Sequence, residues 1–246
     1  MCYRYSIYSK PELIEARYNS TFKEDFTPKY HVSAFSQVKL PVITNNNPQQ
    51  IQLFNWGLIP FWVKDQKQAE EIQQKTANAR AETIYEKPAF RHAAEKKHCL
   101  VLVDGFFEWR EFHGRKYPYY IRLKSHEPFS IAGLWEEWTN KEIDETICSY
   151  TVITTKANPL MEKIHNTKKR MPVILPRELE RLWINDSISK DQAKELLLPI
   201  SEYDMEAYTI SRLITSKTQD PNVPSVIEPY TYPELKDSLN GQLSLF

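Results

Sequence analysis

The sequence predicts an α+β domain built on a mainly antiparallel, partly closed (barrel-like) β-sheet flanked by short helices. Runs of β-branched and aromatic residues of strand length fill the middle of the chain, and short helical patterns interrupt them without strand–helix–strand regularity. No repeat or linker divides the chain before about residue 230. We therefore expect one domain over residues 1–230 and a flexible C-terminal tail over residues 231–246.

Composition limits the classes of function that the chain can have. It has 246 residues, 41% of them apolar, which is enough for one sizeable core. Its 32 Lys and Arg balance its 32 Asp and Glu, so any DNA binding must come from a local positive patch. There is no signal peptide and no 18-residue apolar run, which predicts a cytoplasmic protein without a membrane segment. The three cysteines are scattered and form no CxxC pair, so we expect no disulfide, metal or cofactor.

The first half of the chain mixes helices with short strands. Ser9-Lys10-Pro11-Glu12 predicts a helix start with Ser9 as the cap, and the helix runs to Tyr18. Loops and short strands are expected over residues 29–43, a turn over 45–48 and a strand over 51–56. Residues 65–75 predict a solvated surface helix, and residues 88–96 predict another short helix.

The second half of the chain supplies the core strands. These are expected over residues 99–103, 117–123, 129–134 and 150–154, with turns at Gly114 and around Asn140. A short helix over 158–164 leads to His165, and a strand follows over 171–175. Amphipathic helices are expected over 176–183 and 190–197, and a late strand over 205–212.

Cys2 follows the initiator Met1 directly. Removal of Met1 would give Cys2 a free α-amine beside its thiol, with reference pKa values of about 7.7–8.0 and about 8.5. A minority of each group is then nucleophilic at pH 7. The amine can form a Schiff base with an aldehyde, and the thiol can close a five-membered thiazolidine ring. The simpler alternative is an ordinary cysteine that happens to follow the initiator.

Three further polar residues stand where apolar residues would be expected. Asn78 lies two residues before Arg80, so the two face the same way in extended chain. Glu108 lies among aromatic residues, and burial would raise its pKa toward the range of a general acid–base near neutrality. His165 ends a short helix. The structural alternatives are a helix cap for Asn78, a surface ion pair with Arg110 for Glu108, and a buried structural histidine for His165.

Taken together these features resemble the SRAP family, the abasic-site-processing proteins that crosslink to abasic DNA. The resemblance covers about residues 1–225. The matching segments occur in the family's order: Met1-Cys2, residues 56–62 (WGLIPFW), 78–83 (NARAET), 87–91 (KPAFR), 104–109 (DGFFEW), 132–135 (AGLW), His165, and 170–175 (RMPVIL).

The resemblance implies an enzyme that senses abasic sites in single-stranded DNA and joins them covalently to Cys2 as a thiazolidine. It also implies removal of Met1 by the protein itself and reversal of the crosslink. Asn78 would orient the amine or the sugar, and Glu108 would shuttle protons. His165 would protonate the sugar ring oxygen to open the ring.

The resemblance also implies DNA contacts that position the strand without reading its sequence. Trp62 would stack on a base or wedge at a duplex junction. The expected contacts to phosphates and backbone are Arg4, Arg80, Thr154, Arg170, Ser211 and Arg212.

The chain departs from the family's pattern at three places. Tyr3 stands where glycine is usual, and His31 stands in a segment that is usually Tyr-Asn-Val-Ala-Pro. The spacing from His165 to Arg170 is wider than usual, which makes Lys168 and Lys169 alternative phosphate contacts.

The tail ends in Gln242-Leu243-Ser244-Leu245-Phe246, which resembles the motif that docks bacterial repair proteins on the sliding clamp. We expect a monomer that works at replication forks. Two other functions use part of the same pattern. An N-terminal-nucleophile thiol hydrolase acting on an amide would use Cys2 with His165, but no oxyanion-hole signature is present. A noncatalytic DNA-binding module would need neither Cys2 nor Glu108.

Overall fold

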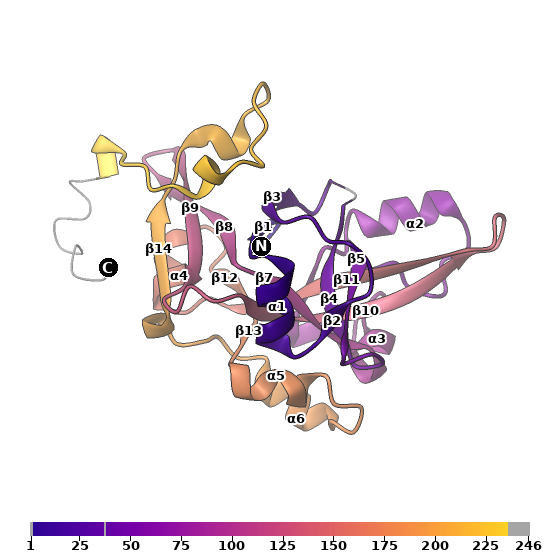
Figure 1. Ribbon diagram of the computed structural model, residues 1–246. Coiled ribbons are helices and arrows are strands. Elements are labelled where there is room, and N and C mark those ends of the chain that lie inside the picture. Colours follow the sequence, from indigo (N-terminus) through magenta and orange to yellow (C-terminus); the bar gives the residue numbers. More distant parts are fainter. Residues whose placement is uncertain (1, 37, 236–246) are drawn as a thin grey trace.

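The computed structural model describes residues 2–36 and 38–235, and its strands form two sheets that meet at the centre of the molecule (Figure 1). Helices lie around them: α2 stands beside the barrel, and α5 and α6 lie together below it in the view of Figure 1.

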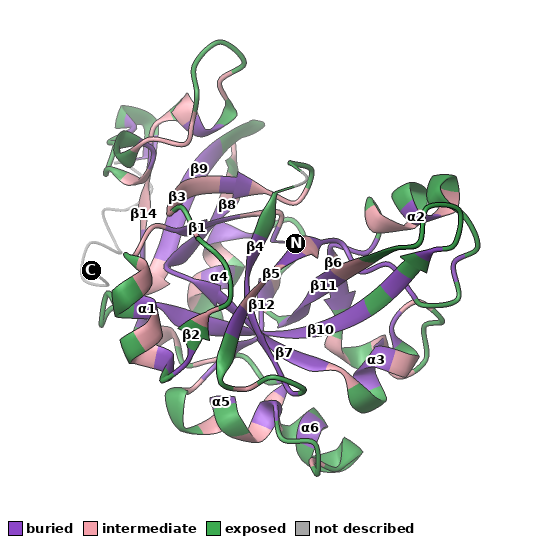
Figure 2. Cartoon of the chain, turned by 45° about the vertical axis from the view of Figure 1, so that its right-hand side comes forward, coloured by how far each residue is buried: buried purple, intermediate pink, exposed green. Residues whose placement is uncertain are grey.

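The first sheet closes on itself as a barrel. Neighbours in the order β11-β10-β7-β4-β5 pair antiparallel, and a parallel pairing of β5 with β11 at Asn55 and Ser149 closes the ring. This confirms the predicted mainly antiparallel, partly closed sheet, and the strands are largely buried (Figure 2). Its strands are β4 (Lys39–Thr44), β5 (Gln50–Trp56), β7 (His98–Val103), β10 (Phe129–Asn140) and β11 (Glu145–Lys156). Four short strands extend it: β2 (Thr21–Phe22), β6 (Asn78–Arg80), β12 (Arg170–Pro172) and β13 (Ile174–Leu175).

The second sheet has the order β14-β9-β8-β1-β3. Its strands are β1 (Arg4–Ile7), β3 (Lys29–Ser33), β8 (Gly105–Phe112), β9 (Arg115–Leu123) and β14 (Met205–Thr209). Strand β8 was not predicted, because its first four residues are all buried and the run shows no alternation of buried and exposed positions. The late strand ends at Thr209, before the 3-10 turn Arg212–Thr215, and not at residue 212 as predicted.

The chain passes from the barrel into the second sheet at Asp104, between β7 and β8. The carboxylate of Asp104 accepts hydrogen bonds from the backbone N–H groups of Tyr8 (2.5 Å) and Ser9 (2.8 Å) and from the Ser9 hydroxyl (2.5 Å). The prediction that Ser9 caps the first helix is therefore wrong. Helix α1 (Pro11–Tyr18) has Lys10 at its cap position, with no side-chain cap bond. The Asp104 bonds tie the end of β1 to the junction of the two sheets.

Short helices fill the connections. Helix α4 packs against β8, and α5 packs against β7 and β10. The helices are α2 (Gln66–Gln73), α3 (Arg91–Lys96), α4 (Pro159–Ile164), α5 (Arg177–Trp183) and α6 (Lys190–Leu196). Within the described residues, no helix is long and apolar enough to cross a membrane.

The packed chain continues past residue 230, where the sequence predicted the domain to end. Tyr232 and Leu235 are both buried, and the Tyr232 hydroxyl donates to the Ile210 carbonyl at 2.9 Å. The pentapeptide Gln242–Phe246 lies outside the described residues.

Candidate active site

Cys2 lies just before β1, which runs between β3 and β8. Its side chain is 1% exposed, and its Sγ donates to the Arg4 carbonyl at 3.6 Å. Burial raises the pKa of the Cys2 thiol well above its usual value, and the charge of Glu108 adds to this effect. The sulfur is therefore held as a thiol in this structure.

Glu108 lies in the buried half of β8 and is 5% exposed. Burial raises its pKa to about 7, although the charge of Arg4 acts in the opposite direction. At neutral pH both its acid and its carboxylate forms are populated, as an acid–base catalyst requires. The surface pair with Arg110 is excluded, because Glu108 is buried and the Arg110 guanidinium lies over the Phe112 ring at 5.6 Å.

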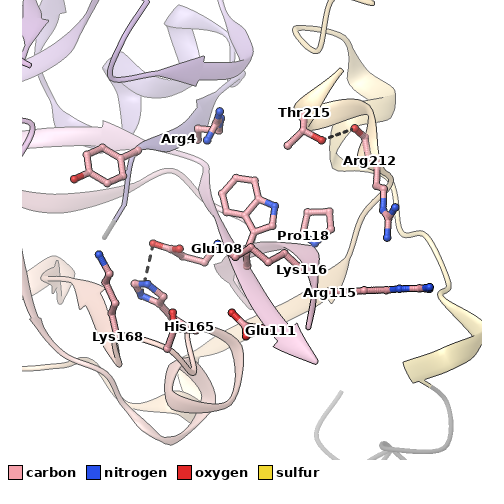
Figure 3. Close-up of a pocket in the computed structure, with 13 residues that line it drawn as sticks. Arg4, Glu108, Glu111, Arg115, Lys116, Pro118, His165, Lys168, Arg212 and Thr215 are labelled. Carbon is pink, nitrogen blue, oxygen red and sulfur yellow. Dashed lines mark hydrogen bonds and ion pairs between the residues drawn. The ribbon is translucent and has the colours of Figure 1, made fainter. Parts of the chain in front are cut away.

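His165 lies at the C-terminal end of α4, as predicted, and is 6% exposed. Its Nδ1 lies 2.9 Å from the Arg170 carbonyl and 3.8 Å from Oε1 of Glu108, and Figure 3 shows the two side chains facing each other. Burial lowers the pKa of His165, and the charge of Lys168 adds to this. The ring is therefore largely neutral at pH 7, with its proton on Nδ1, because a carbonyl oxygen can only accept.

Asn78 begins β6, which runs parallel to β11 with Asn78 opposite Val152. Both polar atoms of its side-chain amide are inaccessible to solvent and have no hydrogen-bond partner among the described residues. A buried amide left unsatisfied costs about 1–3 kcal/mol, which a ligand that bonds to it would offset. The helix-cap alternative is excluded, because Asn78 lies in a strand.

Trp56 lies between the backbone next to Asn78 and the ring of Tyr5. Its Nε1 donates to the carbonyl of Ala77 at 2.8 Å, and its ring lies 4.6 Å from the ring of Tyr5. Burial raises the pKa of Tyr5, and the nearby Cys2 thiol adds to the effect. Cys2, Glu108 and His165 thus form one group, and the rings of Tyr5 and Trp56 pack between this group and the backbone of Ala77, the residue before Asn78.

A cavity of about 950 Å³ opens beside Glu108 and His165 (Figure 3). Two carboxylates, Glu108 and Glu111, line it, against five lysine and arginine side chains. The neutral chain therefore has a local positive surface at this cavity, which would attract phosphate groups. The five cations are Arg4, Arg115, Lys116, Lys168 and Arg212.

Most of the predicted DNA contacts lie at or near the protein surface. Arg4 and Arg212 line the cavity, and Arg80 is exposed. The Ser211 hydroxyl accepts from the backbone N–H of Leu213 at 3.3 Å, which caps the turn that carries Arg212. Trp62 is 43% exposed, so its ring is free to meet a base.

The expectation for Thr154 is corrected by the structure. Thr154 is fully buried, and its hydroxyl donates to the Ala79 carbonyl at 3.2 Å, so it has no exposed atom to offer to DNA. Its carbonyl instead accepts from the Arg170 guanidinium at 2.6 Å. That guanidinium also binds both carboxylate oxygens of Glu82, at 2.5 and 3.0 Å. In this structure Arg170 therefore holds His165 through its backbone and Glu82 through its side chain, while Lys168 lines the cavity.

Some cavity residues were not singled out by the sequence. Arg115 and Lys116 follow the predicted turn at Gly114, and Lys116 lies opposite Glu111 across the β8–β9 pair. The available signal was a basic pair directly after a glycine turn.

His31 is uncharged at neutral pH, since burial and the charge of Arg4 lower its pKa to about 4.

Comparison with known proteins finds relatives that match most of the chain. The family model described as SOS response associated peptidase (SRAP) matches residues 1–217. A Bacillus subtilis protein named abasic site processing protein YoqW is 39% identical over 94% of this chain and 100% of its own length. Abasic site processing protein YoaM of the same organism is 40% identical over 88% of this chain and 93% of its own. A crystal structure from Bacteroides thetaiotaomicron superposes with a TM-score of 0.88 at 39% identity, covering 94% of this chain and 100% of the other.

Proposed function

The chain belongs to the SRAP family, and from that premise we propose that it captures abasic sites in single-stranded DNA as a covalent crosslink to Cys2. One observation carries the proposal: the buried second residue, Cys2, lies beside Glu108, a carboxyl with a pKa of about 7, next to a cavity lined by five cations. Aldehyde capture by an aminothiol needs a nucleophile and a group that both takes and gives protons near pH 7. Strand binding needs the cations.

The reaction begins once Met1 has been removed, a step that we assign to the protein itself. The Cys2 amine adds to the aldehyde carbon of the open abasic sugar to form a carbinolamine. The Glu108 carboxylate takes a proton from the amine, and its acid form returns one to the departing hydroxyl, which leaves as water. The thiol then adds to the imine carbon while its proton passes to the nitrogen, which closes the thiazolidine ring.

His165 and Asn78 act on the sugar. The closed abasic sugar must open before its aldehyde is available, and His165 delivers the proton to the ring oxygen. Its lowered pKa makes the protonated imidazole a stronger acid than usual. Asn78 presents a buried donor and a buried acceptor, which suit an amine or a sugar hydroxyl. Reversal of the crosslink would use the same groups in the opposite order.

The DNA strand is held by its phosphates and is not read by sequence. Arg4, Arg80 and Arg212 hold the backbone, and Trp62 stacks on a base or wedges at a junction. We propose that the protein acts as a monomer in the cytoplasm, at replication forks.

The thiol hydrolase alternative needs a thiolate as its first nucleophile. The raised pKa of the Cys2 thiol counts against that reading.

A denaturing gel tests the proposed function. Processed protein is incubated with an abasic single-stranded oligonucleotide without reductant. We expect a shifted band that is lost in Cys2→Ala and retained in Cys148→Ala, since Cys148 is a free, half-buried cysteine on β11. A processed protein that forms no covalent band would overturn the proposal.

Docking on the sliding clamp through Gln242–Phe246 is a separate proposal. Deletion of these residues should abolish capture by immobilised clamp in a pull-down and leave crosslinking intact. Unchanged capture by the clamp would contradict it.

A further inference from the structure

Phe35 is a large apolar side chain held in solvent. It is 61% exposed, and it lies on the turn after β3. The Ser33 carbonyl accepts from the Ser36 amide at 3.0 Å and from the Ser36 hydroxyl at 2.6 Å, and the Ser33 hydroxyl accepts from the Phe35 amide at 3.3 Å. The turn is thus well fixed while its phenyl ring gains little from burial. An exposed apolar ring held in this way is typical of a contact surface.

Tyr3 connects this ring to the reactive site. Its ring stacks on that of Phe35 with centroids 5.5 Å apart and planes 24° from parallel. Its carbonyl accepts from the backbone N–H of Ala34 at 2.9 Å, which fixes the two segments side by side. Tyr3 also follows Cys2 directly and lines the large cavity beside Glu108. One aromatic pair therefore runs from the reactive residue out to solvent.

Phe35 also lines a small pocket of about 140 Å³. Trp56 and Ala34 supply apolar lining, and the end of α2 supplies polar side chains from Glu70, Gln73 and Gln74.

Gly57 allows the C-terminal end of α2 to lie close to the backbone that follows β5. It has φ +106°, and a Cβ there would lie 2.4 Å from the Gln73 carbonyl oxygen, so only glycine lets the helix end come so near. The pocket combines flat aromatic faces with amide donors and acceptors. Those are the two features by which proteins hold an unpaired nucleobase.

We propose that Tyr3 and Phe35 form a stacking platform for the nucleobase next to the abasic nucleotide, with its edge toward Gln73 and Gln74. This inference rests on the proposed function, because it needs the abasic sugar at Cys2. The large cavity then takes phosphates, and the platform fixes the neighbouring base. Stacking of this kind positions the aldehyde while tolerating any base, since every base offers a flat face.

Fluorescence of a base analogue tests the platform without any covalent step. The oligonucleotide contains a tetrahydrofuran abasic analogue, which has no aldehyde, with 2-aminopurine beside it on either the 5′ or the 3′ side. We expect wild-type protein to quench the probe on one side, because stacking quenches 2-aminopurine. Phe35→Ser should lose that quenching and bind at least about fivefold more weakly. Tyr203→Ser is the matched control, since Tyr203 is 73% exposed and lies outside both cavities.

A second oligonucleotide isolates the pairwise contact. Here the flanking base on the quenched side is also replaced by tetrahydrofuran. Wild-type protein should lose about the same factor in affinity as the Phe35→Ser substitution causes, and the variant should be insensitive to the missing base. Equal quenching by wild type and Phe35→Ser, or additive losses, would overturn the platform. Crosslinking of wild-type protein to an authentic abasic site is scored separately, so failure of the chemistry and failure of the platform are distinguishable.

Discussion

Two buried carboxylates show how the barrel and the site differ. Glu136 in β10 is 1% exposed, and its oxygens lie 2.5 Å from the Lys97 ammonium and 2.8 Å from Nδ1 of His92. Glu108 in β8 is 5% exposed, its distance to His165 is 3.8 Å, and burial raises its pKa to about 7. Burial alone therefore does not mark a catalytic group. What distinguishes Glu108 is its pKa of about 7, at which the acid and the carboxylate are both populated near neutrality.

Two asparagines repeat the contrast. The Asn45 amide donates to the Lys96 carbonyl at 3.0 Å, and its oxygen accepts from the His98 amide at 3.1 Å and from Trp135 Nε1 at 2.9 Å. Asn78 has no such partner among the described residues. The buried amide of Asn45 is fully bonded within the barrel, whereas the buried amide of Asn78 remains available to a ligand.

Matched substitutions of the two carboxylates give the largest expected contrast. Glu108→Gln should slow crosslinking by about one to three orders of magnitude, because the amide cannot exchange a proton. Glu136→Gln should leave that rate within a factor of two but lower the free energy of unfolding by about 1–3 kcal/mol, because Lys97 loses its buried partner at 2.5 Å and keeps only the more exposed Glu137 at 3.4 Å. Gel time courses and urea unfolding measure the two quantities. If Glu108→Gln and Glu136→Gln slow crosslinking equally, the two carboxylates do not differ in their role in catalysis.

Substitutions of Asn78 and Asn45 should likewise affect different quantities, the crosslinking rate and the free energy of unfolding, with a smaller effect on the rate. Asn78→Leu should slow crosslinking by about tenfold, the worth of one good hydrogen bond in the transition state. It should not lower the free energy of unfolding, since no bond within the described structure is lost. Asn45→Leu should lower that free energy by about 2 kcal/mol or more, because several buried groups lose their partner. A large loss of stability in Asn78→Leu would show that this amide is structural.

The smallest expected effect is on the pH dependence of the free energy of unfolding. Folding raises the pKa of Glu108 to about 7. The stabilisation that its protonated form contributes is therefore complete below the pKa of the unfolded chain, and it is lost as the pH rises through about 7. Glu108→Gln carries no such titration. The variant should therefore gain stability relative to wild type between pH 5 and pH 8, measured by urea unfolding at both values. If the free energies of unfolding of the variant and the wild type differ by the same amount at pH 5 and at pH 8, the raised pKa of Glu108 is contradicted.

The sequence predicted the barrel strands and singled out the candidate site residues because each leaves a local mark. Strand runs show β-branched periodicity, and Cys2 and Glu108 stand out from their surroundings. Strand β8 was missed because its first four residues are buried on both faces and the run shows no alternation. Ser9 was misassigned because its partner, Asp104, is remote in sequence. Thr154 matched the family pattern, but its burial depends on the pairing of β11 with β6 and β12. The cavity and the Tyr3–Phe35 stack likewise depend on contacts between distant segments.

The central claim is that the amine and the thiol of Cys2 both bond to the captured aldehyde carbon. The most direct test is the mass of the Cys2 peptide joined to DNA, measured with and without borohydride. A thiazolidine should weigh one water less than its two parts, stay unchanged by borohydride and leave Cys2 resistant to alkylation. Cys2→Ser should give only an imine, which is retained after borohydride reduction. A wild-type adduct that gains two hydrogens on reduction, or that maps to another residue, would contradict the account.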